Sequence, residues 1–192
     1  MTARAKAAAI AHSPLEEMAA TSYMKEISGR AKIVLRGKCD DEQFMTAVQN
    51  ALGLSLPTTV NKTTRDKNYS VLCTGPDEWM VWADDGDGQR VLSLLQDAVK
   101  DTFAALADVS DYYTIIRING DYAERILAAG CPLDLQKTDE CAQSRYANAA
   151  ILLCRAGDDF DVQVRWSFAA YLWRYFETVA LGYKQSTNNF YM

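Results

Sequence analysis

The hydrophobic and polar residues of this chain follow two alternating patterns. Short apolar runs at 31–36, 69–73 and 78–82 are typical of β-strands, and residues 75–77 between the last two predict a hairpin turn. Apolar residues at helical spacing follow the first strand and the hairpin. The helix predicted after the first strand has an apolar face of Phe44, Ala47, Val48 and Ala51. The helix predicted after the hairpin has an apolar face of Val91, Leu92, Leu95, Ala98 and Val99. The predicted order is strand, helix, hairpin, helix.

The second half of the chain repeats this order. Its predicted elements are strands at 105–109 and 114–118, a helix containing Ala123, Ile126 and Leu127, a hairpin of 147–155 and 159–164, and a helix capped by Ser167. Two helix starts carry the spacing of a capping box, with Asp40 before Gln43 and Asp121 before Glu124. The turn at Gly130-Cys131-Pro132 predicts the end of the helix in this half.

The two halves form an internal repeat. Gly37 and Gly120 are 83 residues apart, and Leu72 and Leu153 are 81 apart, so two separate anchors give nearly one offset. We therefore expect an α+β fold of two similar strand-helix-hairpin-helix modules, with helices covering mostly antiparallel sheets. The predicted organisation is an N-terminal arm at 1–29, a first module at 30–104, a second module at 105–183 and a tail at 184–192, with both modules in one compact unit.

Composition narrows the function classes. The 192 residues are 49% hydrophobic and 23% charged, which is ordinary for a globular protein and unlike a disordered one. Twenty basic and 25 acidic residues give a net charge of -5, which disfavours binding to a nucleic-acid backbone. The chain has neither a secretory signal pattern nor an apolar run of 18 residues, so we expect a cytoplasmic protein without a membrane span.

The residues that usually carry catalysis are scarce. His12 is the only histidine, and it lies in the predicted arm, which removes most general-base arrangements. The cysteines have no metal-binding spacing, and we interpret them as buried free thiols of a reducing compartment. They are Cys39, Cys73, Cys131, Cys141 and Cys154. The glycine pair at Gly86 and Gly88 lacks the rest of a phosphate-binding loop, so we expect no bound dinucleotide.

Three polar groups have a functional and a structural interpretation. Asp108, Ser110 and Asp111 form either an acid pair or a turn in which Asp and Ser bond to their own backbone. Cys131 and Asp134 pair a thiol with a carboxylate or form a helix-stop turn. Cys39 has the most polar surroundings of the cysteines, near a predicted helix start.

Aromatic residues are the strongest remaining signal. The four tryptophans are Trp79, Trp82, Trp166 and Trp173, and the last helix also carries Tyr171, Tyr175 and Phe176. Its apolar arc is wider than a single core face needs. The surplus indicates either core packing or a protein interface, where tryptophan, tyrosine and arginine are typical, here with Arg165 and Arg174.

Several segments resemble the gamma subunit of heterotetrameric sarcosine oxidase. The resemblance rests on Leu106–Asp111, Ile116–Gly120 and Ile126–Leu135, with Gly75–Trp79, Cys141–Gln143 and Ser167–Trp173 in the same order as in that family, and it covers about residues 30–181. The family is similar to the folate-binding domain of the glycine-cleavage aminomethyltransferase. The resemblance thus implies a noncatalytic subunit of a complex that oxidatively demethylates sarcosine to glycine, with peroxide and formaldehyde or 5,10-methylenetetrahydrofolate as products.

The resemblance also implies where cofactors and partners lie. FAD, FMN, NAD and zinc would be on the alpha, beta and delta subunits, tetrahydrofolate would be a co-substrate, and this chain would pack mainly on alpha. It implies no catalytic, cofactor-binding or metal-binding residue here. Alternatives are a subunit of a related complex such as N-methylglutamate dehydrogenase, a free-standing folate-binding protein, and a cysteine enzyme acting through Cys39 or Cys131.

Overall fold

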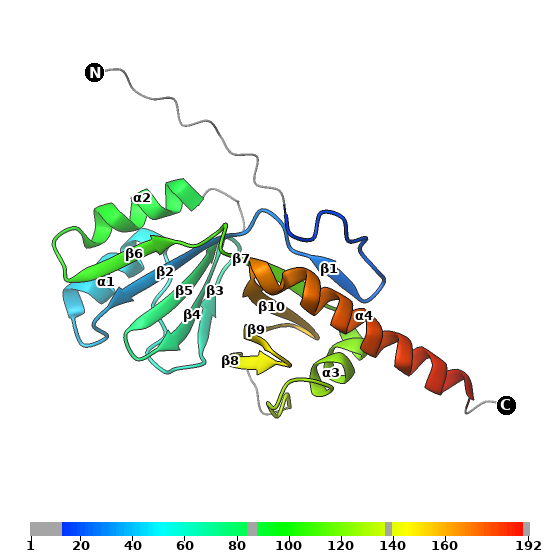
Figure 1. The fold of residues 1–192 in the computed structure, drawn as a ribbon. Coiled ribbons are helices and arrows are strands. Elements are labelled where there is room, and N and C mark those ends of the chain that lie inside the picture. The colour runs from blue at the N-terminus through cyan, green and yellow to red at the C-terminus, as the bar shows by residue number, and fades with distance from the viewer. Residues whose placement is uncertain (1–12, 84–87, 137–139, 190–192) are drawn as a thin grey trace, which may run out of the picture.

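Two sheets, each with helices on its outer face, make up the molecule (Figure 1). The computed structural model describes residues 13–83, 88–136 and 140–189. Within these residues the chain forms two five-stranded sheets in which every strand pairing is antiparallel. The predicted α+β fold with antiparallel sheets is confirmed.

The first sheet has the strand order β3-β4-β5-β2-β6. Its strands are β2 (Ala31–Gly37), β3 (Thr63–Arg65), β4 (Tyr69–Gly75), β5 (Glu78–Ala83) and β6 (Ala104–Asp108), and its helices are α1 (Glu42–Leu52) and α2 (Gly88–Val99). The ring of Phe44 in α1 lies where a Cβ on Gly37 would stand, so α1 packs closely on the end of β2 because Gly37 has no side chain.

The second sheet has the matching strand order β1-β7-β10-β9-β8. Its strands are β1 (Met24–Glu26), β7 (Tyr113–Ile118), β8 (Cys141–Tyr146), β9 (Ala149–Ala156) and β10 (Asp159–Arg165), and its helices are α3 (Gly120–Ala128) and α4 (Trp166–Asn189).

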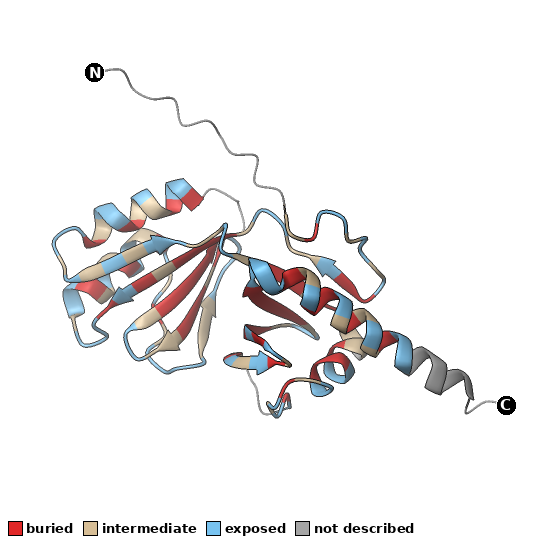
Figure 2. Ribbon diagram, viewed as in Figure 1, coloured by how far each residue is buried: buried red, intermediate tan, exposed pale blue. Residues whose placement is uncertain are grey.

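Buried side chains form three hydrophobic clusters. Two of them lie between a sheet and its own helices, around Leu35 in the first half and Ile116 in the second. The third lies between the two sheets, on the faces turned away from the helices, and contains Leu72, Met80 and Leu152. Central strands are thus covered on both faces, which explains their continuous apolar runs (Figure 2).

Strand pairing crosses the predicted module boundaries. Residues 105–109 were expected to open the second module, but β6 pairs with β2 at the edge of the first sheet. The predicted arm at 1–29 contains β1, which pairs with β7 at the edge of the second sheet. Leu15 and Met24 from the same segment are buried in the second core. The described part of the arm therefore completes the second half.

Two helix starts differ from the predicted capping boxes. The N-cap of α1 is Asp41, whose carboxylate accepts a hydrogen bond from the Phe44 backbone N–H at 3.1 Å, and not Asp40. The N-cap of α3 is Asn119, which places Asp121 inside the helix. Helix α4 also continues to Asn189, through much of the predicted tail.

Candidate functional site

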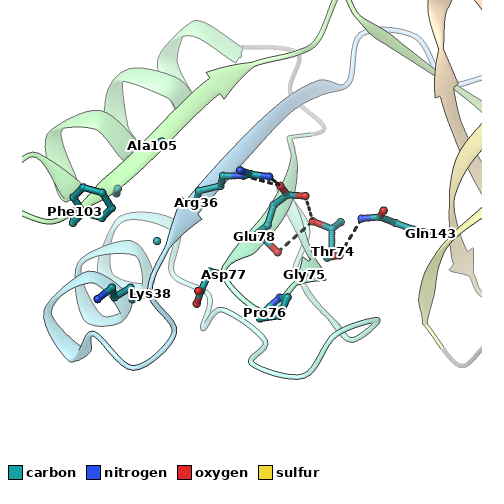
Figure 3. Close-up of a pocket in the computed structure, with 12 residues that line it drawn as sticks. Arg36, Lys38, Thr74, Gly75, Pro76, Asp77, Glu78, Phe103, Ala105 and Gln143 are labelled. Atoms are coloured by element: carbon teal, nitrogen blue, oxygen red, sulfur yellow. Dashed lines mark hydrogen bonds and ion pairs between the residues drawn. The ribbon is translucent and has the colours of Figure 1, made fainter.

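A groove of 670 Å³ lies at one end of the first sheet (Figure 3). It is lined by the end of β2, the turn between β4 and β5, the residues around the start of β6, and Gln143 from β8 of the other sheet. Arg36 and Lys38 bring two cations to it, and Phe103 adds a ring that is 85% exposed.

Hydrogen bonds hold the polar residues of this groove in place. Arg36 pairs with the Glu78 carboxylate through two nitrogens, and its Nε lies 2.7 Å from Oε2. The Thr74 hydroxyl donates to the other Glu78 oxygen at 3.0 Å, and Gln143 Nε2 donates to the Thr74 carbonyl at 3.0 Å. The Asp77 carboxylate accepts from the backbone N–H of Cys39 at 3.1 Å. The carboxylates of Asp77 and Glu78 therefore hold the turn between β4 and β5 against β2 and the residues that follow it. Because both are engaged in this way, the groove is better suited to binding than to proton transfer.

Ser110 and Asp111 line a second, smaller cavity, and Asp108 is hydrogen-bonded to Ser110. Ser110 Oγ donates to the Asp108 carboxylate at 2.5 Å, and the Ser110 backbone N–H donates to the same oxygen at 2.9 Å. This local bonding is the turn that the structural interpretation predicted. Ser110 Oγ also accepts from the backbone N–H of Lys32 at 3.0 Å, which attaches the turn to β2.

Lys32 is a polar residue that sequence reasoning missed. It is 5% exposed, lines the same cavity of 170 Å³, and donates from Nζ to the Arg30 carbonyl at 2.7 Å. Burial, and then the charge of Arg30, lower the pKa of Lys32, while the charges of Asp108, Asp111 and Glu26 act in the opposite direction. A lone lysine within an apolar strand is the signal that could have identified it.

The cysteines are free thiols, and four of the five are buried. Burial raises the pKa of Cys141 to about 12 and that of Cys154 to about 11, and it also raises the pKa of Cys73. Those three thiols stay protonated at neutral pH, so they are poor nucleophiles.

The two cysteines of the hypothetical cysteine enzyme lie in different surroundings. Cys39 is exposed beside the groove residue Lys38, and its backbone N–H bonds to Asp77. Cys131 is buried, and its thiol donates to the Ser144 hydroxyl at 3.6 Å. Asp134, its predicted partner, accepts from the backbone N–H of Gln136 at 3.2 Å, as in a turn.

The remaining sequence predictions concern His12, the glycine pair, metal binding and membrane spans. His12 and Gly86 lie outside the described residues. Within those residues, no three His, Cys, Asp or Glu side chains are grouped so that they could hold a metal ion. No helix described is long and apolar enough to span a membrane.

The aromatic residues divide between core and surface. Trp79, Trp82 and Trp173 are at most 1% exposed, so Trp173 belongs to the core, and its Nε1 donates to Glu177 at 3.1 Å. Trp166 and Tyr171 are 43% and 40% exposed. Core packing thus accounts for Trp79, Trp82 and Trp173, and the interface interpretation stays a prediction for the exposed Trp166 and Tyr171.

A family model and a curated relative both identify the same protein family for this chain. The sequence model of the sarcosine oxidase, gamma subunit family matches residues 36–181. The protein named sarcosine oxidase subunit gamma from Corynebacterium sp. (strain U-96) is 26% identical over 161 residues, which cover 76% of this chain and 78% of that protein.

Two solved structures share the fold. A chain of heterotetrameric sarcosine oxidase from Corynebacterium sp. U-96 has a TM-score of 0.79 at 23% identity, covering 88% of this chain and 93% of the other. Aminomethyltransferase T of the glycine cleavage system from Bartonella henselae has a TM-score of 0.59 at 17% identity, covering 80% of this chain and 44% of the other. The predicted likeness of the fold to both proteins is confirmed.

Proposed function

This chain belongs to the sarcosine oxidase, gamma subunit family, and on that premise we propose that it is a noncatalytic structural subunit of a heterotetrameric sarcosine oxidase. The complex would demethylate sarcosine oxidatively to glycine, with peroxide and formaldehyde or 5,10-methylenetetrahydrofolate as products. The observation that carries the proposal is the family match over residues 36–181. A curated relative from Corynebacterium is itself named sarcosine oxidase subunit gamma.

The proposed role is assembly, with the chemistry on other subunits. The chain would pack mainly on the alpha subunit, with beta and delta completing the complex in the cytoplasm, and FAD, FMN, NAD and zinc would be bound by those partners. Two features of the structure support a structural role. The carboxylates of the groove are engaged in fixing their own loop, and the thiols of Cys73, Cys141 and Cys154 are held protonated.

Co-expression with the alpha, beta and delta subunits from the same source tests this function. We expect the chain to copurify with alpha at one to one, in a complex that consumes oxygen when sarcosine is added. A preparation without this chain should yield less assembled complex. Assembly of the other three subunits at full yield and full turnover, with this chain eluting alone, would contradict the proposal.

Titration of the isolated chain with tetrahydrofolate separates this function from folate binding. A structural subunit should give no heat of binding and no change in tryptophan fluorescence. Saturable binding to the chain alone would instead identify a folate-binding protein with the aminomethyltransferase fold.

A further inference from the structure

We propose that the outer face of α4 is the surface on which a partner subunit of the oxidase docks. We call it the aromatic face. On α4 it consists of Trp166, Phe168, Tyr171 and Arg174, and beside the start of α4 it includes Tyr112, just before β7, and Arg165, the last residue of β10. The partner it fits presents apolar side chains with carboxylates at their edge. This inference rests on the proposed function and identifies the surface through which the chain contacts its partner.

Helix α4 is apolar on two faces, and the molecule covers only one of them. Its inner row, which includes Leu172 and Phe176, is fully buried in the second core. Its outer row carries Phe168 and Tyr171, which are 37% and 40% exposed, and Leu181, which is 56% exposed, extends the row. Figure 2 shows buried and exposed residues alternating along α4. The exposed side of α4 carries these apolar side chains beside the polar residues Ser167, Arg174 and Thr178, and exposed apolar side chains that lie close together mark interaction sites. The outer row is therefore expected to be covered in the assembled protein.

The rings of the aromatic face form two groups near the start of α4. Phe168 and Tyr171 are in edge contact, with centroids 6.4 Å apart. Trp166 and Tyr112 are 43% and 48% exposed and line a cavity of 390 Å³ together with Arg165. A hollow bordered by tryptophan and tyrosine is the usual receptor for an anchoring side chain at the centre of an interface.

Charge identifies the kind of partner. Arg165 lies over the Tyr112 ring at 5.4 Å from its centroid, and Arg165 and Arg174 are both exposed. Neither arginine forms an ion pair with a described carboxylate. Asp111 is exposed beside the same cavity, and Glu177, which follows Arg174 by one turn, is half-buried and accepts a hydrogen bond from Trp173 Nε1. The exposed arginines therefore outnumber the exposed acids of this face two to one, in a chain whose net charge is -5. Carboxylates on the partner would complement these cations.

A second copy of the chain fits this face poorly. In a two-fold dimer, the same patch meets itself, so the arginines of both copies would enter one interface with few acids to neutralise them. A different subunit has no such constraint. The groove around Phe103 is a weaker candidate, because it holds one exposed ring among cations and carboxylates that are balanced in number.

The test uses the co-expressed four-subunit complex. The double variant Phe168→Asp/Tyr171→Asp should lower the amount of this chain recovered with alpha by about tenfold or more, since it removes two exposed rings of the face and places two carboxylates opposite the acidic edge of the partner. Thr58→Asp/Val60→Asp is the matched control, because it adds the same two charges at exposed positions of the first half outside the groove and the aromatic face, and it should leave recovery unchanged. Thermal melting of each isolated variant checks that the fold persists.

A second variant keeps the test decisive if the aspartates disturb the helix. Arg165→Glu/Arg174→Glu changes exposed charges and should weaken recovery most at low salt. If wild-type chain copurifies with alpha and both double variants do so equally well, the face is wrong and the subunit role stands. If wild-type chain does not copurify, the proposed function fails. If the isolated chain sediments as a dimer that the double variants dissociate, a second copy occupies the face and the inference is overturned.

Discussion

Trp173 and Tyr171 lie two residues apart on α4 in opposite surroundings. Trp173 is 1% exposed in the second core, and Tyr171 is 40% exposed. Replacing a buried tryptophan by alanine removes contacts and leaves a cavity, so Trp173→Ala should lower the free energy of unfolding by about 3–5 kcal/mol. Tyr171→Ala should change it by about 0.5 kcal/mol or less in the isolated chain. Urea unfolding of both variants checks the pair, and equal losses would place Tyr171 in the core as well.

The cysteines should differ in reactivity according to their burial. Cys39 is exposed, and the other four thiols are buried, three of them with a raised pKa. A chromogenic disulfide reagent at neutral pH should therefore modify one thiol per folded chain and all five in denaturant. Cys39→Ser should abolish the reaction of the folded chain. Modification of a second thiol at a similar rate would show that a buried cysteine opens to solvent.

Lys32 should make stability depend on alkaline pH. Because burial lowers its pKa from the ordinary value of 10.5, the folded chain holds this proton less tightly than the unfolded chain. The unfolded state then binds more protons between the lowered pKa and 10.5, so stability rises with pH over that interval. Lys32→Met removes this contribution. Urea unfolding at several pH values should show wild type gaining stability relative to the variant as pH rises, and parallel curves would exclude the effect.

Strand β1 turns a predicted arm into part of the second sheet. Met24 is fully buried against the core, whereas Lys25 on the same strand is exposed. Met24→Ala should therefore cost about 2–5 kcal/mol of stability, and Lys25→Ala about 0.5 kcal/mol or less. Thermal or urea unfolding measures both. A neutral Met24→Ala would mean that the strand contributes little beyond its backbone pairing.

Elements with strong periodicity were predictable, and short polar strands were not. The hairpin at Gly75–Glu78 and the helices with apolar faces follow directly from local pattern. The edge strands β3 and β8 were missed for different reasons. Thr63–Arg65 is short and polar. In Cys141–Tyr146 the buried residues Cys141, Ala142 and Tyr146 do not alternate regularly with the polar ones, so the period of a strand is hidden. The exchange of β1 and β6 depends on contacts distant in sequence, which no local pattern contains.

The internal repeat was detected with its hairpin anchor shifted by one residue. Leu72 was matched to Leu153, but Val71 pairs with Val81 just as Leu153 pairs with Val162, on the faces that meet the helices. A register shift between Cys73 and Gly75 in the first hairpin accounts for the extra residue. The predicted turn at Asp108 was correct. The groove, and the cavity beside Lys32, combine residues from separate strands, so no local pattern contains them.

Across the whole molecule, polar contacts join the two sheets at buried positions. Trp82 Nε1 donates to Gln163 Oε1 at 2.7 Å, and the carboxylate of Asp161 binds Arg30 from the first half at 2.9 Å and Arg117 from the second at 2.6 Å. Asp161 is 2% exposed. Separating the halves would expose the cluster between the sheets and leave these buried polar groups without partners, which is costly.

The two halves should consequently unfold as one cooperative unit. Labelling with fluorotryptophan gives probes in both helix-facing cores, at Trp79 and Trp173, and between the sheets at Trp82. The cluster between the sheets contains side chains from both halves. In addition, β1 comes before the first sheet in the sequence but pairs in the second sheet, and β6 comes after β5 but returns to pair with β2. The native fluorine signals should therefore all disappear at the same urea concentration. Early loss of the Trp79 signal, with that of Trp173 retained, would show that the first half unfolds independently.

Asp161→Ala should lower the common midpoint for all probes together, since it leaves two arginines without their shared carboxylate. A shift confined to the Trp173 signal would contradict a shared interface and restore the picture of two separable modules.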